Sequence, residues 1–145
     1  MRLIIVLSLL LAAAASAQPP RSYPILGKVV RENAKLDALI EPGAQIEMLA
    51  SGFEWSEGPV WDRQGQFLLF SDIPNNAVMK WSREKGVELY LKPAGYTGVA
   101  SYGREPGSNG LILDPRGRLI SMEHGDRRVS RLELGGGKIT LVDRY

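Results

Sequence analysis

The chain has 145 residues, with 18 Lys and Arg, 16 Asp and Glu, one His and no Cys, and a formal net charge of +2. This length allows one domain at most. Without cysteine the protein cannot be stabilised by disulfide bonds. The small net charge gives no electrostatic basis for binding nucleic acid, so no nucleic-acid partner is expected.

The first seventeen residues have the pattern of a secretory signal peptide. Arg2 supplies the positive end, residues 4–15 the apolar run, and Ala15-Ser16-Ala17 the small-residue cleavage site. The apolar run is short for a membrane span, and no basic stop residues follow it. We therefore expect residues 1–17 to direct export, to a periplasm or out of the cell, and the mature chain to have no membrane anchor.

Residues 18–45 are expected to form a leader in front of the main domain. Prolines at positions 19, 20 and 24 favour extended backbone. The apolar positions between Val29 and Ile40 permit one short helix, which Pro42-Gly43 would end. Residues Ile46–Gly52 then have the composition of a strand followed by a glycine turn.

The next segment consists of short apolar runs separated by turn residues, which predicts one four-stranded antiparallel sheet. The predicted strands are residues 58–62, 66–71, 77–81 and 87–91. The turns between them are residues 62–65, 72–76 and 82–86.

The same pattern then returns. Asp114 follows Asp62 by 52 residues, and Gly117 follows Gly65 by the same interval. A period of about 50 residues with four strands in each repeat is typical of β-propeller blades. The predicted fold is therefore all-β, and blades are favoured over a two-sheet sandwich. The glycine-rich segment 93–108 lies between the repeats, and we expect it to help roof a pocket.

The segment from Trp55 to Trp61 places one carboxylate, Glu57, next to Gly58-Pro59 and between two large rings. This arrangement suggests a carboxylate directed into a site, and an ordinary exposed glutamate is the alternative. The tryptophans, Trp81 included, are expected to serve packing rather than to act as platforms for sugars.

Five motifs in this order resemble the gluconolactonase/regucalcin (senescence marker protein) family, and the similarity runs from about Leu36 to the last residue. The resemblance implies a six-bladed β-propeller, of which this chain carries about two blades. Residues 46–145 would form the N-terminal part of that propeller. The motifs are residues 53–61, 69–74, 108–111, 114–119 and 123–129.

The resemblance also implies a site. Glu57 matches the family's first metal-binding carboxylate, and Asn109 matches a polar residue that reaches metal-bound water or substrate. Glu123 and His124 match a motif at the channel mouth of bacterial lactonases and are expected to contact the substrate. The implied cofactor is a divalent cation, with Ca²⁺ as the first choice and Zn²⁺, Mg²⁺ or Mn²⁺ as others. Carboxylate and amide oxygens are suitable ligands for Ca²⁺.

The implied activity is metal-dependent hydrolysis of a sugar lactone, a small-molecule partner. A further Asn and the Asp expected to act as general base would fall beyond residue 145. No catalytic base is therefore expected in this sequence, and activity is expected to need later blades. Two alternatives stay open: a non-catalytic propeller that binds metal or sugar, and an inactive truncated fragment. His124 could also be an ordinary turn histidine, and Asn109-Gly110 a plain turn.

Overall fold

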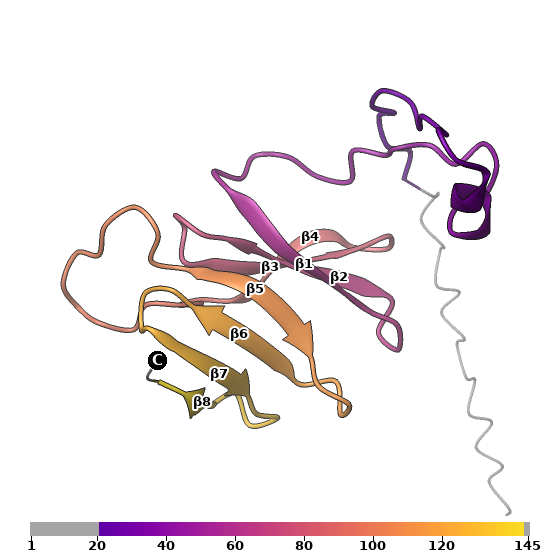
Figure 1. Ribbon diagram of the computed structural model, residues 1–145. Helices are drawn as coiled ribbons and strands as arrows, with labels where there is room; N and C mark the ends of the chain where they lie inside the picture. Colours follow the sequence, from indigo (N-terminus) through magenta and orange to yellow (C-terminus); the bar gives the residue numbers. More distant parts are fainter. Residues whose placement is uncertain (1–20, 144–145) are drawn as a thin grey trace, which may run out of the picture.

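A computed structural model describes residues 21–143, which form two four-stranded antiparallel sheets side by side (Figure 1). In each sheet the strands follow chain order. This arrangement confirms the all-β prediction, while the predicted signal peptide lies outside the described residues. The strands are β1 (Ser56–Asp62), β2 (Phe67–Asp72), β3 (Ala77–Ser82), β4 (Gly86–Leu91), β5 (Ser108–Leu113), β6 (Leu119–Glu123), β7 (Arg128–Leu132) and β8 (Lys138–Val142).

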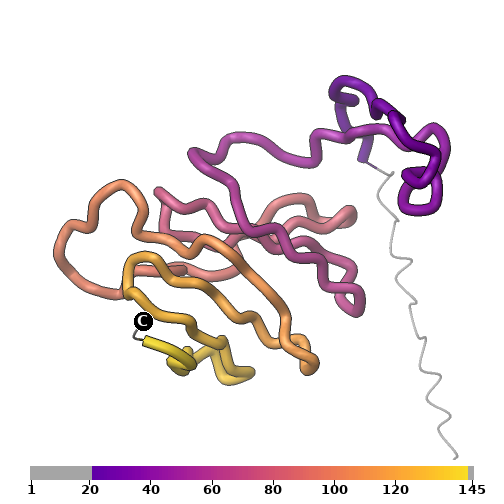
Figure 2. The backbone as a smooth tube through the Cα atoms, viewed as in Figure 1, coloured from indigo at the N-terminus to yellow at the C-terminus, as the bar shows by residue number. Residues whose placement is uncertain are grey.

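The leader contains little regular structure, as its backbone trace shows (Figure 2). The predicted helix is limited to a 3₁₀ turn, η1 (Ala34–Ala38), whose first turn is capped by the side chain of Asn33. Among the described residues, no helix has both the length and the apolar character needed to cross a membrane.

The strand predicted at Ile46–Gly52 is wrong. This segment makes one isolated bridge, between Ile25 and Glu47. The backbone N–H of Leu26 donates to the Ile46 carbonyl at 2.8 Å, so the leader itself supplies the partner. Strand structure needs a continuous neighbouring strand, and the local sequence pattern could not show that the described chain offers none here.

The first turn of each sheet is built in the same way. The Asp62 carboxylate accepts a hydrogen bond from the backbone N–H of Gln64 at 2.9 Å. The Asp114 carboxylate accepts one from the N–H of Arg116 at 2.8 Å. An aspartate that binds the backbone two residues ahead stabilises a tight turn. The repeated aspartates therefore mark equivalent turns, as their spacing predicted.

Asp114 also belongs to a charged network that connects two turns. Arg118 contacts Asp114 at 2.8 Å and Glu133 at 2.9 Å. Hydrogen bonds from the backbone N–H and the guanidinium of Arg118 hold the pKa of the Asp114 carboxyl below its usual range. Arg131, and then Arg118, lower the pKa of Glu133 in the same way. The network fixes the β5–β6 turn to the end of β7.

The hydrophobic core joins the two sheets. Leu69 and Val78 of the first sheet pack with Leu119 of the second, and Ala94 from the connecting segment completes the buried cluster. Removal of this apolar surface from water holds the blades together. Partly buried residues packed against the cluster are Val60, Phe67, Leu91, Leu111, Leu113 and Leu132.

The first strands of the two sheets, β1 and β5, approach each other closely at Gly58. A Cβ atom added there would lie far closer to the Asn109 carbonyl oxygen than van der Waals contact allows. Gly58 also has φ +59°, a backbone conformation that favours glycine. Nearby, the Ser71 hydroxyl lies 2.8 Å from the Ser108 hydroxyl and donates to the Asn109 carbonyl at 3.0 Å. Gly58 is thus required by both backbone geometry and packing.

We predict that Gly58→Ala lowers the free energy of unfolding by about 3 kcal/mol, because strain in the backbone adds to the clash with β5. Denaturant unfolding followed by circular dichroism measures the change. Gly117→Ala is the matched control, because Gly117 has φ +75° with open space around it. The control should lose only about 1 kcal/mol, the cost of the backbone strain alone. Equal losses in the two variants would contradict the importance of the contact.

Candidate functional site

Glu57 and Asn109 occupy equivalent positions in the two sheets. Asn109 follows Glu57 by 52 residues, the same interval that separates the repeated Asp turns. A β-bulge interrupts the pairing of β1 between Glu57 and Val60, and another interrupts β5 between Ser108 and Leu111. Bulges redirect side chains and are common beside active sites. The interval of 52 residues in the sequence therefore indicated that Glu57 and Asn109 are equivalent.

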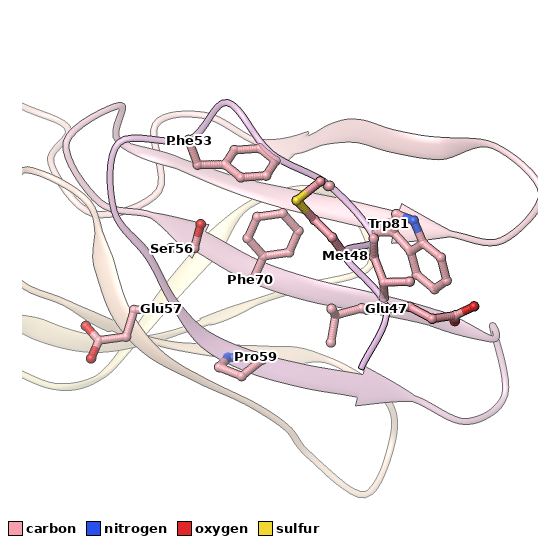
Figure 3. Close-up of a pocket in the computed structure, with 11 residues that line it drawn as sticks. Glu47, Met48, Phe53, Ser56, Glu57, Pro59, Phe70 and Trp81 are labelled. Carbon is pink, nitrogen blue, oxygen red and sulfur yellow. The ribbon is translucent and has the colours of Figure 1, made fainter. Parts of the chain in front are cut away.

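The Glu57 side chain is exposed, and no hydrogen bond or ion pair within residues 21–143 involves its carboxylate. Glu57 lies at the edge of an apolar groove of about 340 Å³. Figure 3 shows that its carboxylate points away from the rings of Phe53 and Phe70 in that groove. The groove is therefore not where Glu57 would act, and its carboxylate is free to bind a ligand outside it.

Asn109, Glu123 and His124 line one cavity of about 200 Å³. The structure thus brings three of the four predicted site residues together. Glu57 is on β1 of the first sheet and does not line this cavity. Across residues 21–143, no group of three or more His, Cys, Asp or Glu side chains is placed to hold a metal ion. Glu57 and the Asn109 amide therefore provide oxygen donors that fit a hard cation but not a complete coordination sphere.

His124 is held by the segment that connects the two sheets. Its Nδ1 atom lies 2.7 Å from the carbonyl oxygen of Glu105, and the Tyr102 hydroxyl donates to the His124 carbonyl at 3.1 Å. The Tyr102 ring also makes an edge contact with the imidazole. Because a carbonyl can only accept, Nδ1 carries the proton and Nε2 of the neutral ring is left as an acceptor. Segment 93–108, which was expected to help roof a pocket, here supports a side chain that lines the cavity.

We predict that neutral His124 is the Nδ1–H tautomer. His124 is the single histidine of the chain, so its ring nitrogens can be assigned without ambiguity in a long-range ¹H–¹⁵N NMR spectrum. Nδ1 should give a protonated, pyrrole-type shift and Nε2 an unprotonated, pyridine-type shift. A spectrum with the opposite pattern, or with averaged shifts, would contradict the hydrogen bond to Glu105.

The Glu123 carboxylate is fully buried and has three protein partners. Lys138 and Arg128 each contact it at 2.6 Å, and the Ser130 hydroxyl donates to it at 2.5 Å. Glu123 follows Asp72 by 51 residues, and each ends the second strand of its sheet; Asp72 accepts hydrogen bonds from the backbone N–H groups of Glu54 and Trp55, whereas the partners of Glu123 are side chains. These contacts favour a structural role for Glu123. Its contact with a substrate stays a prediction.

We predict that Glu123→Gln lowers the free energy of unfolding by about 3 kcal/mol, because it leaves Lys138 without its counter-charge and Arg128 with only its pair to Asp126. Chemical denaturation measures this loss. Glu88→Gln is the control, since its exposed pair with Lys85 is 4.0 Å apart, and it should change stability by less than about 0.5 kcal/mol. A Glu123→Gln variant as stable as the unmodified protein would contradict the structural role and favour the substrate role.

The two four-stranded antiparallel sheets are adjacent. Their bulged first strands carry ligand-type side chains at equivalent positions. These features define consecutive blades of a β-propeller. Residues 55–143 match the family described as SMP-30/Gluconolactonase/LRE-like region. The chain belongs to this family, as its motifs indicated.

Individual relatives agree with this assignment. Over 136 residues, the chain is 37% identical to a gluconolactonase of Zymomonas mobilis. The aligned region covers 92% of this chain and 38% of that relative. A gluconolactonase structure from Xanthomonas campestris matches with a TM-score of 0.64 and 27% identity, over 90% of this chain and 40% of that one. An X-ray structure of a gluconolactonase-family protein matches with a TM-score of 0.54 and 32% identity, over 67% of this chain and 30% of that one. The chain therefore spans less than half the length of each of these relatives.

Proposed function

We propose that this chain supplies the first two blades of a metal-dependent hydrolase of sugar lactones. The proposal rests on family membership and on one structural observation. That observation is the pair of equivalent bulges in β1 and β5: Glu57 and Asn109 lie at these bulges, and the Glu57 carboxylate has no hydrogen-bond or ion-pair partner within residues 21–143. We further propose that the substrate is a small sugar lactone and that residues 1–17 export the protein.

The proposed cofactor is a divalent cation, with Ca²⁺ as the first choice because the available donors are a carboxylate and an amide oxygen. Glu57 would bind the ion directly, and Asn109 would bind the ion, its water or the substrate. When bound, such a cation polarises a lactone carbonyl and makes bound water more acidic. The remaining ligands and the general base would come from residues outside the described chain.

The second-sheet residues would orient the substrate. The Asn109 amide can both donate and accept hydrogen bonds, which suits a sugar hydroxyl. His124, with Nδ1 bonded to Glu105, would accept a hydrogen bond from a hydroxyl through Nε2. Since both residues line one cavity, they would contact neighbouring groups of the same molecule.

A second candidate function is binding of metal or sugar without hydrolysis. It is favoured by one observation: Asn109 and His124 line one cavity, an arrangement that suffices to bind a sugar and requires no general base. The two functions make the same use of Glu57 and differ in turnover, so one set of measurements separates them.

We predict that Glu57→Gln, in the protein expressed from its whole coding sequence, weakens Ca²⁺ binding by at least about tenfold, because a ligand charge is lost. Calorimetry measures Ca²⁺ affinity, and acid release measured in a pH-stat gives kcat/KM for a sugar lactone, which should fall at least as far. Glu84→Gln, in the exposed β3–β4 turn, is the control and should match the unmodified protein. Unchanged Ca²⁺ affinity in Glu57→Gln would contradict the proposal. Ca²⁺ binding without turnover would favour the non-catalytic alternative.

A further inference from the structure

A third cavity, of about 640 Å³, lies beside the site already described. It lies where β1 begins and β2 ends, against the segment that connects the two sheets. Its volume is in the range that holds small organic ligands. The lining residues are Glu54, Trp55, Pro74, Gly103, Arg104 and Glu105.

Trp55 gives this cavity an aromatic wall. Within the described residues Trp55 and Trp61 are 49% and 43% exposed, so neither is buried in the core, whereas Trp81 is buried as predicted. The backbone of Trp55 is fixed at two points: its N–H donates to the Asp72 carboxylate at 3.3 Å, and its carbonyl accepts from the Ile73 N–H at 3.1 Å. The indole is therefore anchored through its backbone while much of its surface stays open to solvent.

The polar groups of the cavity are available for a ligand. Within residues 21–143, neither the Arg104 guanidinium nor the Glu54 carboxylate makes a hydrogen bond or an ion pair. Glu105 is fixed through its carbonyl by Nδ1 of His124, with its carboxylate 4.0 Å from the same nitrogen. His124 in turn lines the cavity that contains Asn109. The third cavity therefore borders the proposed catalytic site through the Glu105–His124 contact.

We propose that this third cavity is a carbohydrate subsite that binds a neutral sugar ring. The apolar C–H face of the ring would stack on the indole of Trp55, and its hydroxyls would hydrogen-bond to Glu54 and Arg104. Two carboxylates against one guanidinium give the cavity a net negative charge. Such a cavity favours a neutral ring over a sugar acid.

The subsite rests on the proposed function and adds a consequence to it. Hydrolysis opens a neutral lactone to an acid, so the product carries a negative charge that the substrate lacks. The subsite would therefore retain the substrate and disfavour the product. This preference also specifies the substrate as one with an uncharged sugar ring.

The test measures binding of two probes, D-glucose as a neutral sugar and D-gluconate as a sugar acid, by calorimetry on the full chain. The unmodified protein is expected to bind glucose at least fivefold more tightly than gluconate. Trp55→Leu is expected to weaken glucose binding at least tenfold, and Trp55→Tyr, which keeps an aromatic face, is expected to restore most of it. Trp61→Leu is the matched control, because Trp61 is a similarly exposed tryptophan near the far end of β1, outside this cavity. The control is expected to stay within twofold of the unmodified protein.

Three results would overturn the subsite: no glucose binding by the unmodified protein at millimolar concentration, equal affinities for the two probes, or equal losses in the Trp55→Leu and Trp61→Leu variants. If Trp55→Leu fails to fold, the variants Trp55→Tyr and Glu54→Gln together test the subsite. Trp55→Tyr should keep most of the affinity for glucose, and Glu54→Gln should lower the ratio of glucose affinity to gluconate affinity. A different result from either variant overturns the subsite. These readouts do not use Ca²⁺ or turnover, so failure of the subsite is distinguishable from failure of the proposed function.

Discussion

The close contact between the backbones of β1 and β5 is the constraint on which the candidate site depends. Gly58 has no side chain, and this allows β1 to approach the Asn109 carbonyl. The Ser71 hydroxyl fixes the same carbonyl with a partly buried hydrogen bond. Because Glu57 immediately precedes Gly58, any shift between the two sheets would change the position of Glu57 relative to Asn109. The geometry of the site therefore depends directly on the packing between the two blades.

The segment that connects the two sheets, residues 93–108, fixes the part of the site that contains His124. The Asn76 side chain accepts hydrogen bonds from three successive backbone N–H groups, those of Ala94, Gly95 and Tyr96. Farther along the segment, Glu105 fixes the imidazole of His124. A long loop with defined contacts at its start and near its end can present side chains as precisely as a strand can. The loop thus links the Asn109 cavity with the cavity lined by Trp55.

The fold could be predicted from the sequence because the patterns that indicate it are local and repeated. The spacing of Asp62 and Asp114 predicted two blades, and the same spacing relates Glu57 to Asn109. Features that depend on distant partners could not be read in this way. Residues 46–52 have the composition of a strand, but the described chain provides no strand beside them. The pair of buried Glu123 and partly buried Lys138 joins positions fifteen residues apart, which no local pattern indicates. The exposure of Trp55 likewise depends on which segments cover it.

The central claim is that the paired bulges direct Glu57 and Asn109 toward one shared cation. Anomalous diffraction from crystals soaked in Mn²⁺, a substitute for Ca²⁺ with a strong anomalous signal, tests it most directly. The account predicts one peak within bonding distance of the Glu57 carboxylate, with the Asn109 amide oriented toward the ion or its bound water. A peak elsewhere that leaves Glu57 without an ion, or a Glu57-bound ion with Asn109 turned away, would contradict it.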